Sequence, residues 1–355
     1  MRHTPLYDEH VRSGGKIVDF SGWALPVQVA GILDEHQHTR TKASIFDCSH
    51  MGEFRVEGRQ GIEAYNALVT TDVFKLKLGR ARYGFMLNDD GGVIDDLITM
   101  RPAEDELFVV TNAGPLEKVS TLLTACVPGL KDISAETAKI DVQGPLSRDI
   151  LTGIGIDVAA ELRYFGLGRT VWDGHPVLLS RTGYTGELGY ELYLPNGAAV
   201  PLWQALLEHA EVAPAGLGAR DTLRLEMGYL LSGQDLDATR TPLEAGQEFF
   251  VDWDADFTGR AALERQRDSG GFHVLTPVRT ASRQAPRHGF EVYNGDDVVG
   301  TVTSGTYGPS VGHGIGLAYL APQYANPGQA LAAGPRRIAI EVTELPFYKA
   351  GTCRG

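Results

Sequence analysis

One carboxylate interrupts an otherwise apolar face of an expected strand. Asp96 lies in the segment 93–101, which follows the turn-rich residues 88–92, so we expect the return strand of a hairpin there. Because side chains alternate along a strand, Asp96 shares a face with Ile94, Ile98 and Met100. An unpaired ionised carboxylate on such a face costs several kcal/mol. Asp96 therefore either lies near a strand end, where solvent or backbone groups satisfy it, or has a function.

Glu191 and Arg220 are also polar residues in apolar surroundings. Glu191 lies in a strand expected over 189–194, on the same face as Tyr193. Arg220 lies on a helix expected from Gly218 to about Leu231, in one stripe with Leu223, Met227 and Leu231. Its guanidinium either extends outward along its own apolar stem or pairs with a buried polar group.

These three residues have polar and aromatic neighbours in the expected elements, namely Tyr83, Asn112, Tyr184 and Tyr229. A carboxylate accepts paired N–H donors, an arginine meets ring acceptors, and aromatic rings cover the faces of a flat ligand. Two acids, one guanidinium and several tyrosines suit a nitrogen-rich heterocycle. The residues alone therefore indicate a ligand-binding enzyme and nothing more specific.

The composition is that of a globular protein with two or three domains. The chain has 355 residues, of which 43% are hydrophobic and 22% charged. No apolar run reaches the length of a membrane span, so we expect no membrane partner. The net charge of −13 disfavours binding to a phosphate backbone, so we expect no nucleic-acid partner.

The cysteines and histidines give no sign of a metal site. Cys48, Cys126 and Cys353 are too far apart for a zinc site or a disulfide framework, so we expect no metal and a reducing compartment. His36 and His38, on a helix expected from about 32 to 43, point to different sides and are expected at the surface. The first ten residues resemble neither a signal nor a transit peptide, which predicts a bacterial, cytoplasmic protein.

Strands and helices alternate along the first three quarters of the chain without a regular repeat. No strand is followed by GxGxxG or by a Walker loop, which argues against a dinucleotide or P-loop site. After Gly270 the sequence becomes rich in Val, Thr, Gly and Pro, which predicts a separate, mostly β domain. We place that boundary near Gly270.

Ten motifs along the chain resemble, in order, those of the aminomethyltransferase of the glycine cleavage system, its T component. They span essentially the whole sequence: Gly22-Trp23 with Pro26-Val27-Gln28, Phe46 to Phe54, Met86 to Asn88, Gly91 to Leu97, Val109 to Ala113, Arg181 to Glu187, Gly218 to Glu226, Val251 to Trp253, Thr303 to Thr306 and Leu345 to Phe347. Departures are mild, such as Cys48 where valine is common.

The resemblance implies an α+β fold in which three domains form a cloverleaf around a central folate channel. Its N-terminal folate-binding region would be 1–269, made of two intertwined α+β domains, roughly 1–50 plus 135–269 and 51–134. The remaining residues, 270–355, would form a small β-barrel-like domain.

By position, the resemblance assigns the catalytic aspartate to Asp96. Glu191 and Arg220 would bind the pterin, and the folate pocket would be lined by Asn112, Tyr83, Tyr184, Tyr229 and Met51. The implied reaction transfers the one-carbon unit of an aminomethyl group, held on the dihydrolipoyl arm of the H protein, to tetrahydrofolate. The products would be ammonia and 5,10-methylenetetrahydrofolate, and no metal would take part.

Other proteins with this fold offer alternatives. One is a folate-binding factor that maintains iron–sulfur enzymes, but residues 246–248 lack the Cys and Tyr that precede Gly-Gln-Glu in those proteins. Another is a folate-dependent demethylase module, which usually carries a flavin domain, and a third is a non-enzymatic binding module. Because the lipoylated partner is usually acidic, the resemblance also predicts a local Lys/Arg patch beside the channel mouth.

Overall fold

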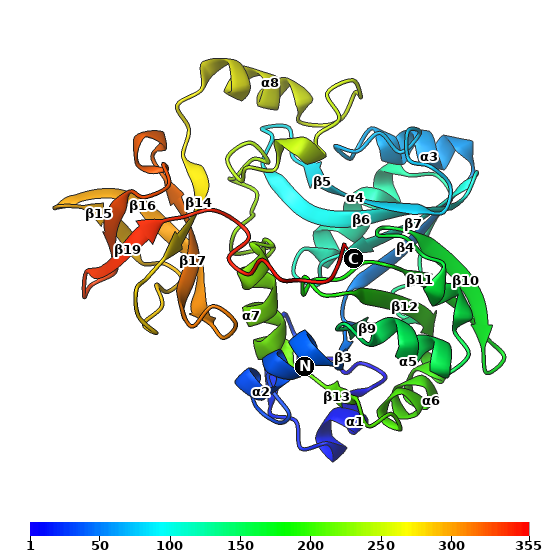
Figure 1. Cartoon of the computed structure of the whole chain (residues 1–355). Coiled ribbons are helices and arrows are strands. Elements are labelled where there is room, and N and C mark those ends of the chain that lie inside the picture. Colours follow the sequence, from blue (N-terminus) through cyan, green and yellow to red (C-terminus); the bar gives the residue numbers. More distant parts are fainter. Residues whose placement is uncertain (355) are drawn as a thin grey trace.

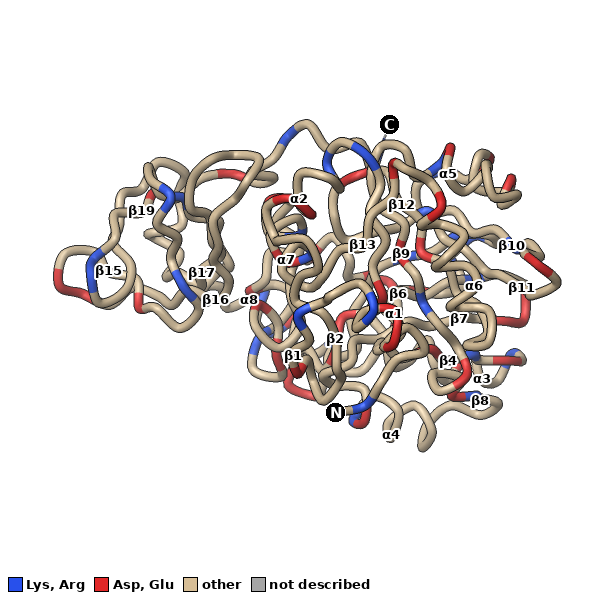
Figure 2. The backbone as a smooth tube through the Cα atoms, turned by 90° about the horizontal axis from the view of Figure 1, so that it is seen from below, with Lys and Arg blue, Asp and Glu red and all other residues tan. Residues whose placement is uncertain are grey.

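The computed structural model describes residues 1–354 and contains two large sheets, a small two-stranded sheet and a barrel, joined by helices (Figure 1). Helices are combined with largely antiparallel sheets, so the predicted α+β class is confirmed. In Figure 2 the barrel lies to one side, and α2 (Ile32–Thr41) and α7 (Leu217–Met227) lie between it and the two sheets. None of the helices in the described part of the chain is both long and apolar enough to cross a membrane.

The first sheet has five strands in the order β5-β6-β7-β4-β8. Their bounds are β4 Gly52–Glu57, β5 Arg80–Leu87, β6 Val93–Ala103, β7 Glu106–Thr111 and β8 Leu130–Asp132. The helices α3 (Arg59–Asn66) and α4 (Leu116–Cys126) pack on one face through buried aliphatic side chains. The predicted hairpin is present, since β5 pairs antiparallel with β6.

The second sheet has six strands in the order β10-β11-β12-β9-β3-β13. Their bounds are β3 Ala43–Asp47, β9 Thr137–Gln143, β10 Leu167–Trp172, β11 His175–Ser180, β12 Gly189–Pro195 and β13 Val212–Pro214. The helices α5 (Ser147–Gly153) and α6 (Asn196–Leu207) and the 3-10 turn η1 (Asp157–Ala160) contribute to its core, which includes the fully buried Trp203. On β12, Tyr190, Leu192 and Leu194 face this core, which leaves Glu191 and Tyr193 on the other side.

The N-terminal segment packs beside the second sheet. It contains the helix α1 (Tyr7–Arg12), the two-stranded sheet of β1 (Ile17–Phe20) and β2 (Trp23–Pro26), and α2. The expected helix from Gly218 to about Leu231 is shorter than predicted. It ends at Met227 because Gly228 adopts a left-handed conformation with φ 73°, which glycine accepts without a steric cost.

The barrel follows the 3-10 turn η2 (Glu248–Phe250) and the helix α8 (Arg260–Ser269). Six strands close it in the order β14-β17-β16-β15-β18-β19, which confirms the predicted β-barrel-like C-terminal domain. Their bounds are β14 Val274–Arg279, β15 Glu291–Asn294, β16 Asp297–Gly308, β17 His313–Leu320, β18 Ala330–Ala333 and β19 Ile338–Val342, with η3 at Pro322–Tyr324.

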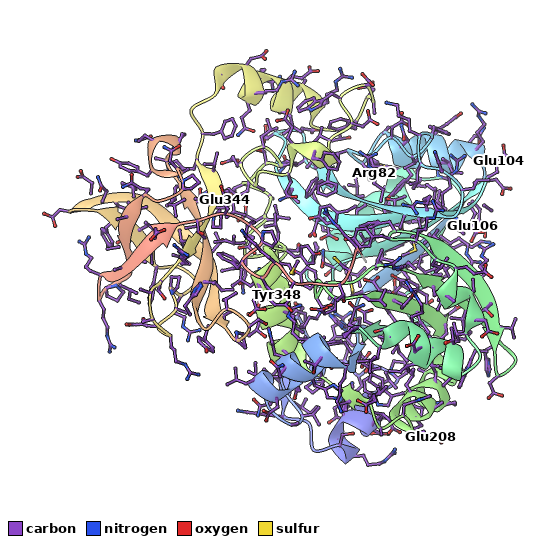
Figure 3. The ribbon with its side chains drawn as sticks, viewed as in Figure 1. Arg82, Glu104, Glu106, Glu208, Glu344 and Tyr348 are labelled. Atoms are coloured by element: carbon purple, nitrogen blue, oxygen red, sulfur yellow. The ribbon has the colours of Figure 1, made fainter. Side chains whose placement is uncertain are left out.

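The segment after β19 leaves the barrel and returns to the middle of the molecule. Figure 3 labels Glu344 near the barrel and Tyr348 near α7. Tyr348 donates its backbone N–H to Glu226 of α7, and Arg40 of α2 stacks on its ring at 4.2 Å. Further on, Thr352 donates its hydroxyl to Glu187 at 2.6 Å. The C-terminal segment thus ties the barrel to the loop before β12.

Candidate active site

Asp96 is half-buried on β6, and its carboxylate accepts two side-chain hydrogen bonds. Tyr83 on β5 donates its hydroxyl to Oδ2 at 3.0 Å, and Asn112, just after β7, donates its side-chain amide to Oδ1 at 2.9 Å. Within residues 1–354 no lysine or arginine forms an ion pair with this carboxylate. Burial raises the pKa of Asp96 to about 6, and the two hydrogen bonds only partly oppose that rise.

The neighbouring Asp95 is buried even more deeply, on the opposite face of β6. Asn112 donates to it twice, through the backbone N–H at 2.9 Å and the side-chain amide at 2.8 Å, and Ser232 adds a hydroxyl at 3.2 Å. Burial, with the adjacent charge of Asp96 as the next cause, holds the pKa of Asp95 well above its usual range. Strand alternation therefore marks Asp95 at least as strongly as Asp96, although the sequence argument singled out only Asp96.

Asn112 holds the two acids together. Its one amide nitrogen contacts the carboxylates of Asp95 and Asp96 and also donates to the backbone carbonyl of Asp96 at 2.8 Å. Because an amide can donate without carrying charge, this arrangement satisfies two acids while adding no cation. Asp96, whose pKa is raised to about 6, can consequently gain or lose a proton near neutral pH.

A second cluster lies on the other sheet, around Glu191 of β12. Tyr193 donates its hydroxyl to Glu191 at 2.6 Å, and Lys139 of β9 lies 3.3 Å from the same carboxylate. Lys139 also donates to Asp141 at 2.5 Å. All four side chains are buried. Burial alone would lower the pKa of Lys139, but the charges of Asp141 and Glu191 outweigh it and raise that pKa.

Arg220 on α7 completes this second cluster. Its guanidinium donates to Asp141 at 2.9 Å, so of the two alternatives in the sequence the buried polar partner is correct. Burial would raise the pKa of Asp141, but the charges of Lys139 and Arg220 more than offset the effect of burial and lower this pKa. Asp141 and Lys139 were missed from the sequence because their importance depends on Arg220, 79 positions away from Asp141.

Tyrosines connect the two clusters. The guanidinium of Arg220 lies over the ring of Tyr184 at 5.0 Å, and that ring stacks on Tyr229 with centroids 5.9 Å apart. Tyr184 donates its hydroxyl to the backbone carbonyl of Leu230. Burial raises the pKa of Tyr184, and Asp96 and Arg220 are among the charged groups that also act on its phenol. Tyr184 therefore lies within electrostatic range of both clusters.

The facing surfaces of the two sheets also meet through apolar contacts. Phe108 of β7 packs edge-on against Tyr193 of β12, with centroids 5.0 Å apart. Met51 is half-buried and packs against this same contact region from the loop before β4. The sequence-predicted residues thus come from both sheets and from α7. The folate channel itself remains a prediction.

Sequence reasoning misplaced His36. It was expected at the surface, but it is fully buried between α2 and α7. Its two ring nitrogens lie 2.8 Å from the hydroxyls of Thr222 and Ser310, and it lies 3.3 Å from Glu226. His36 therefore belongs to a polar network that joins α2, α7 and the barrel, away from the two acid clusters.

Comparison with known proteins gives matches over nearly the full chain. The family described as GCVT N-terminal domain matches residues 6–255, and the one described as glycine cleavage T-protein C-terminal barrel domain matches residues 273–349. An aminomethyltransferase of Halothermothrix orenii is 40% identical over 356 residues, covering 98% of this chain and 100% of the relative. One from Listeria welshimeri is 40% identical over 354 residues, covering 98% of each.

A solved structure is similar over the same length. The crystal structure of the glycine cleavage system aminomethyltransferase T from Bartonella henselae superposes with a TM-score of 0.94. It is 32% identical in sequence, and the match covers 99% of each chain. Both sheets and the barrel therefore have counterparts in that structure.

Proposed function

Because this chain belongs to the glycine cleavage T-protein family of aminomethyltransferases, we propose that Asp96 is its catalytic acid–base group. The chain is an enzyme of the glycine cleavage system that transfers an aminomethyl-derived one-carbon unit. All the relatives named above are aminomethyltransferases. This favours the transferase over the iron–sulfur maintenance factor and over the demethylase module.

The proposed substrates are tetrahydrofolate and the aminomethylated dihydrolipoyl arm of the H protein. One folate nitrogen bonds to the methylene carbon as the C–N bond to the leaving ammonia breaks, and a second folate nitrogen bonds to the same carbon as the C–S bond breaks, which gives 5,10-methylenetetrahydrofolate. The two protons lost by the folate nitrogens leave on ammonia and on the lipoyl sulfur. The attacking nitrogen must lose a proton, and positive charge develops at the methylene carbon. A carboxylate placed beside that carbon serves both needs.

The observation that supports this role is the state of Asp96. It is half-buried, it accepts hydrogen bonds only from neutral donors, and its pKa of about 6 lies near neutrality. A general base works best when its pKa lies close to the working pH. Tyr83 and Asn112 fix the carboxylate in place, so they position the group that moves the proton.

Glu191 and Arg220 are proposed to bind the pterin. A pterin offers adjacent N–H donors to a carboxylate and ring nitrogen and oxygen acceptors to a guanidinium. Tyr184 and Tyr229 supply aromatic faces beside Arg220, and Met51 supplies apolar surface. This end of the site keeps fixed charges, which suits binding more than proton transfer.

The acidic H protein is proposed to approach near β5. Lys77, Arg80 and Arg82 precede Tyr83 in the chain; Lys77 is exposed, and the two arginines are half-buried. Figure 3 labels Arg82 on the first sheet. Opposite charges speed encounter at low ionic strength.

Ammonia release tests the whole proposal. The purified chain is mixed with tetrahydrofolate and aminomethylated H protein, and ammonia and methylenetetrahydrofolate are measured together. We expect both products in equal amounts, and neither when tetrahydrofolate or the H protein is omitted. Release that is independent of tetrahydrofolate would contradict the proposal.

A further inference from the structure

Glu53 is a fully buried acid on β4 with no role in the function argued so far. Neither of its carboxylate oxygens has a hydrogen-bond partner among the described residues. Its backbone groups are hydrogen-bonded, because the N–H donates to the hydroxyl of Ser134 at 2.9 Å and the carbonyl accepts from the backbone N–H of Ile133. The missing partners are therefore those of the side chain alone.

The sheet register shows which way this side chain points. Glu53 pairs with Val110, Val110 pairs with Ile98, and Ile98 pairs with Tyr83, so the four form one row across the sheet. Residues directly opposite each other on neighbouring strands share a face. Glu53 consequently lies on the face of the sheet that carries Tyr83 and its acceptor Asp96.

Across from this face lies the second cluster. The charges of Lys139, Asp141 and Glu191 all act on Glu53, and Glu53 acts on the phenol of Tyr193. Among the described residues, Lys139 forms ion pairs with Asp141 and Glu191 but not with Glu53. Burial holds the pKa of Glu53 well above its usual range, which favours the neutral carboxyl form.

We infer that Glu53 is a further binding residue for the pterin of tetrahydrofolate, contacting its polar edge from the side opposite Glu191. The inference rests on the proposed function, because it needs a folate to enter between the two sheets. A neutral carboxyl group offers one O–H donor and a carbonyl acceptor, and a pterin edge carries both N–H and C=O groups. Glu53 would therefore add a neutral contact to the charged ones of Glu191 and Arg220.

A purely structural role explains the geometry less well. A buried acid that supports the fold is normally hydrogen-bonded, because an unsatisfied buried polar group destabilises the folded state. Glu53 has no such bonds at its side chain. A ligand that supplies the missing partners would account for its burial without them.

The test compares Glu53→Leu and Glu53→Gln with the wild-type chain. We expect Glu53→Leu to raise Kd and KM for tetrahydrofolate about tenfold, with kcat within about twofold, since roughly one hydrogen bond to the ligand is lost. Glu53→Gln keeps a donor and an acceptor and should recover most of the affinity. The melting temperature of the Leu variant should stay equal or rise. Glu57→Leu, on the same strand with a side chain 41% exposed, is the matched control and should leave Kd unchanged.

Each outcome has one meaning. If the wild-type chain binds tetrahydrofolate and Glu53→Leu binds equally well, the role of Glu53 is refuted while the proposed function stands. If the wild-type chain does not bind tetrahydrofolate, both are refuted. A Leu variant with a lower melting temperature and an equal loss of kcat at unchanged KM would indicate a structural role and would also overturn the inference.

Discussion

Each of the two large sheets carries a pair of acids, buried or half-buried, but the groups that stabilise the two pairs differ. Asp95 and Asp96 on the first sheet are held by a phenol, an amide and a hydroxyl, none of which is charged. Asp141 and Glu191 on the second sheet are held by the cations Lys139 and Arg220.

This difference changes what each acid can do. Neutral donors offset only part of the free energy needed to bury a charge. The pKa of Asp96 therefore rises to about 6, and the group can exchange a proton near neutral pH. Cations overcome that cost and hold the pKa of Asp141 low, so its charge is permanent. Under the proposed function, proton transfer would belong to the first sheet and charge-based recognition to the second. Four changes to the chain test that division.

The largest effect is expected for Asp96→Asn. The amide keeps the size of the side chain but cannot accept a proton, so kcat should fall by about 10²- to 10⁴-fold, the range typical of a lost general base. Ammonia release under saturating substrates measures it, and the melting temperature should hold or rise because a buried charge is removed. Turnover close to that of the wild type would remove Asp96 from the mechanism.

Lys139→Met should mainly lower the free energy of unfolding. It leaves Asp141 and Glu191 with one cation fewer in a buried site, and breaking a buried ion pair typically costs about 3 to 5 kcal/mol. Denaturant unfolding measures this loss. The control is Lys131→Met, whose ion pair with Glu57 is solvent-exposed, and it should leave the unfolding midpoint unchanged. Equal effects of both variants would mean that burial does not distinguish the pairs.

Glu191→Ala should weaken binding more than chemistry. Removing one charged contact to the pterin should raise KM for tetrahydrofolate roughly tenfold, while kcat changes less. Steady-state kinetics with the H protein held at saturation separate the two constants. A fall in kcat at constant KM would show that Glu191 takes part in the chemical step, and it would contradict the proposed division of roles between the two sheets.

The smallest effect is a displaced pH profile. The base form of Asp96 is present above its pKa, so kcat should decline as the pH falls through about 6. The hydroxyl of Tyr83 stabilises the charged carboxylate, so Tyr83→Phe should move the midpoint upward, by about one pH unit. A midpoint that stays in place, or moves downward, would show that this hydrogen bond does not control the proton on Asp96.

Local patterns in the sequence predicted the strands and helices, but they did not predict which side chains meet in the two acid clusters. Alternation placed Asp96 on a strand and Glu191 on the same face as Tyr193, and composition predicted that the C-terminal part is mostly β. Alternation could not choose between Asp95 and Asp96, because both interrupt apolar faces of the same strand. Alternation was used to single out Asp96, and the motifs of the family resemblance agreed with that choice, but the same pattern marks Asp95 equally.

The remaining site depends on contacts that no local pattern contains. Asp141 looks like an ordinary strand residue until Arg220 is brought to it from α7. Glu53 likewise has an unremarkable place on a short strand, and only the register across four strands shows its direction. His36 was misjudged because its partners Thr222 and Ser310 are 186 and 274 positions away.

The second sheet is interrupted in sequence by the first. Its strand β3 ends at Asp47, and its neighbour β9 begins only at Thr137, with all five strands of the first sheet between them. On a ribosome, which releases the chain from its N-terminus, the sheet that carries Asp96 is complete once residue 132 has emerged. Strand β3 must wait unpaired for nearly a hundred further residues. All strands of the sheet that carries the proposed catalytic group are thus available for pairing before the second sheet can be completed.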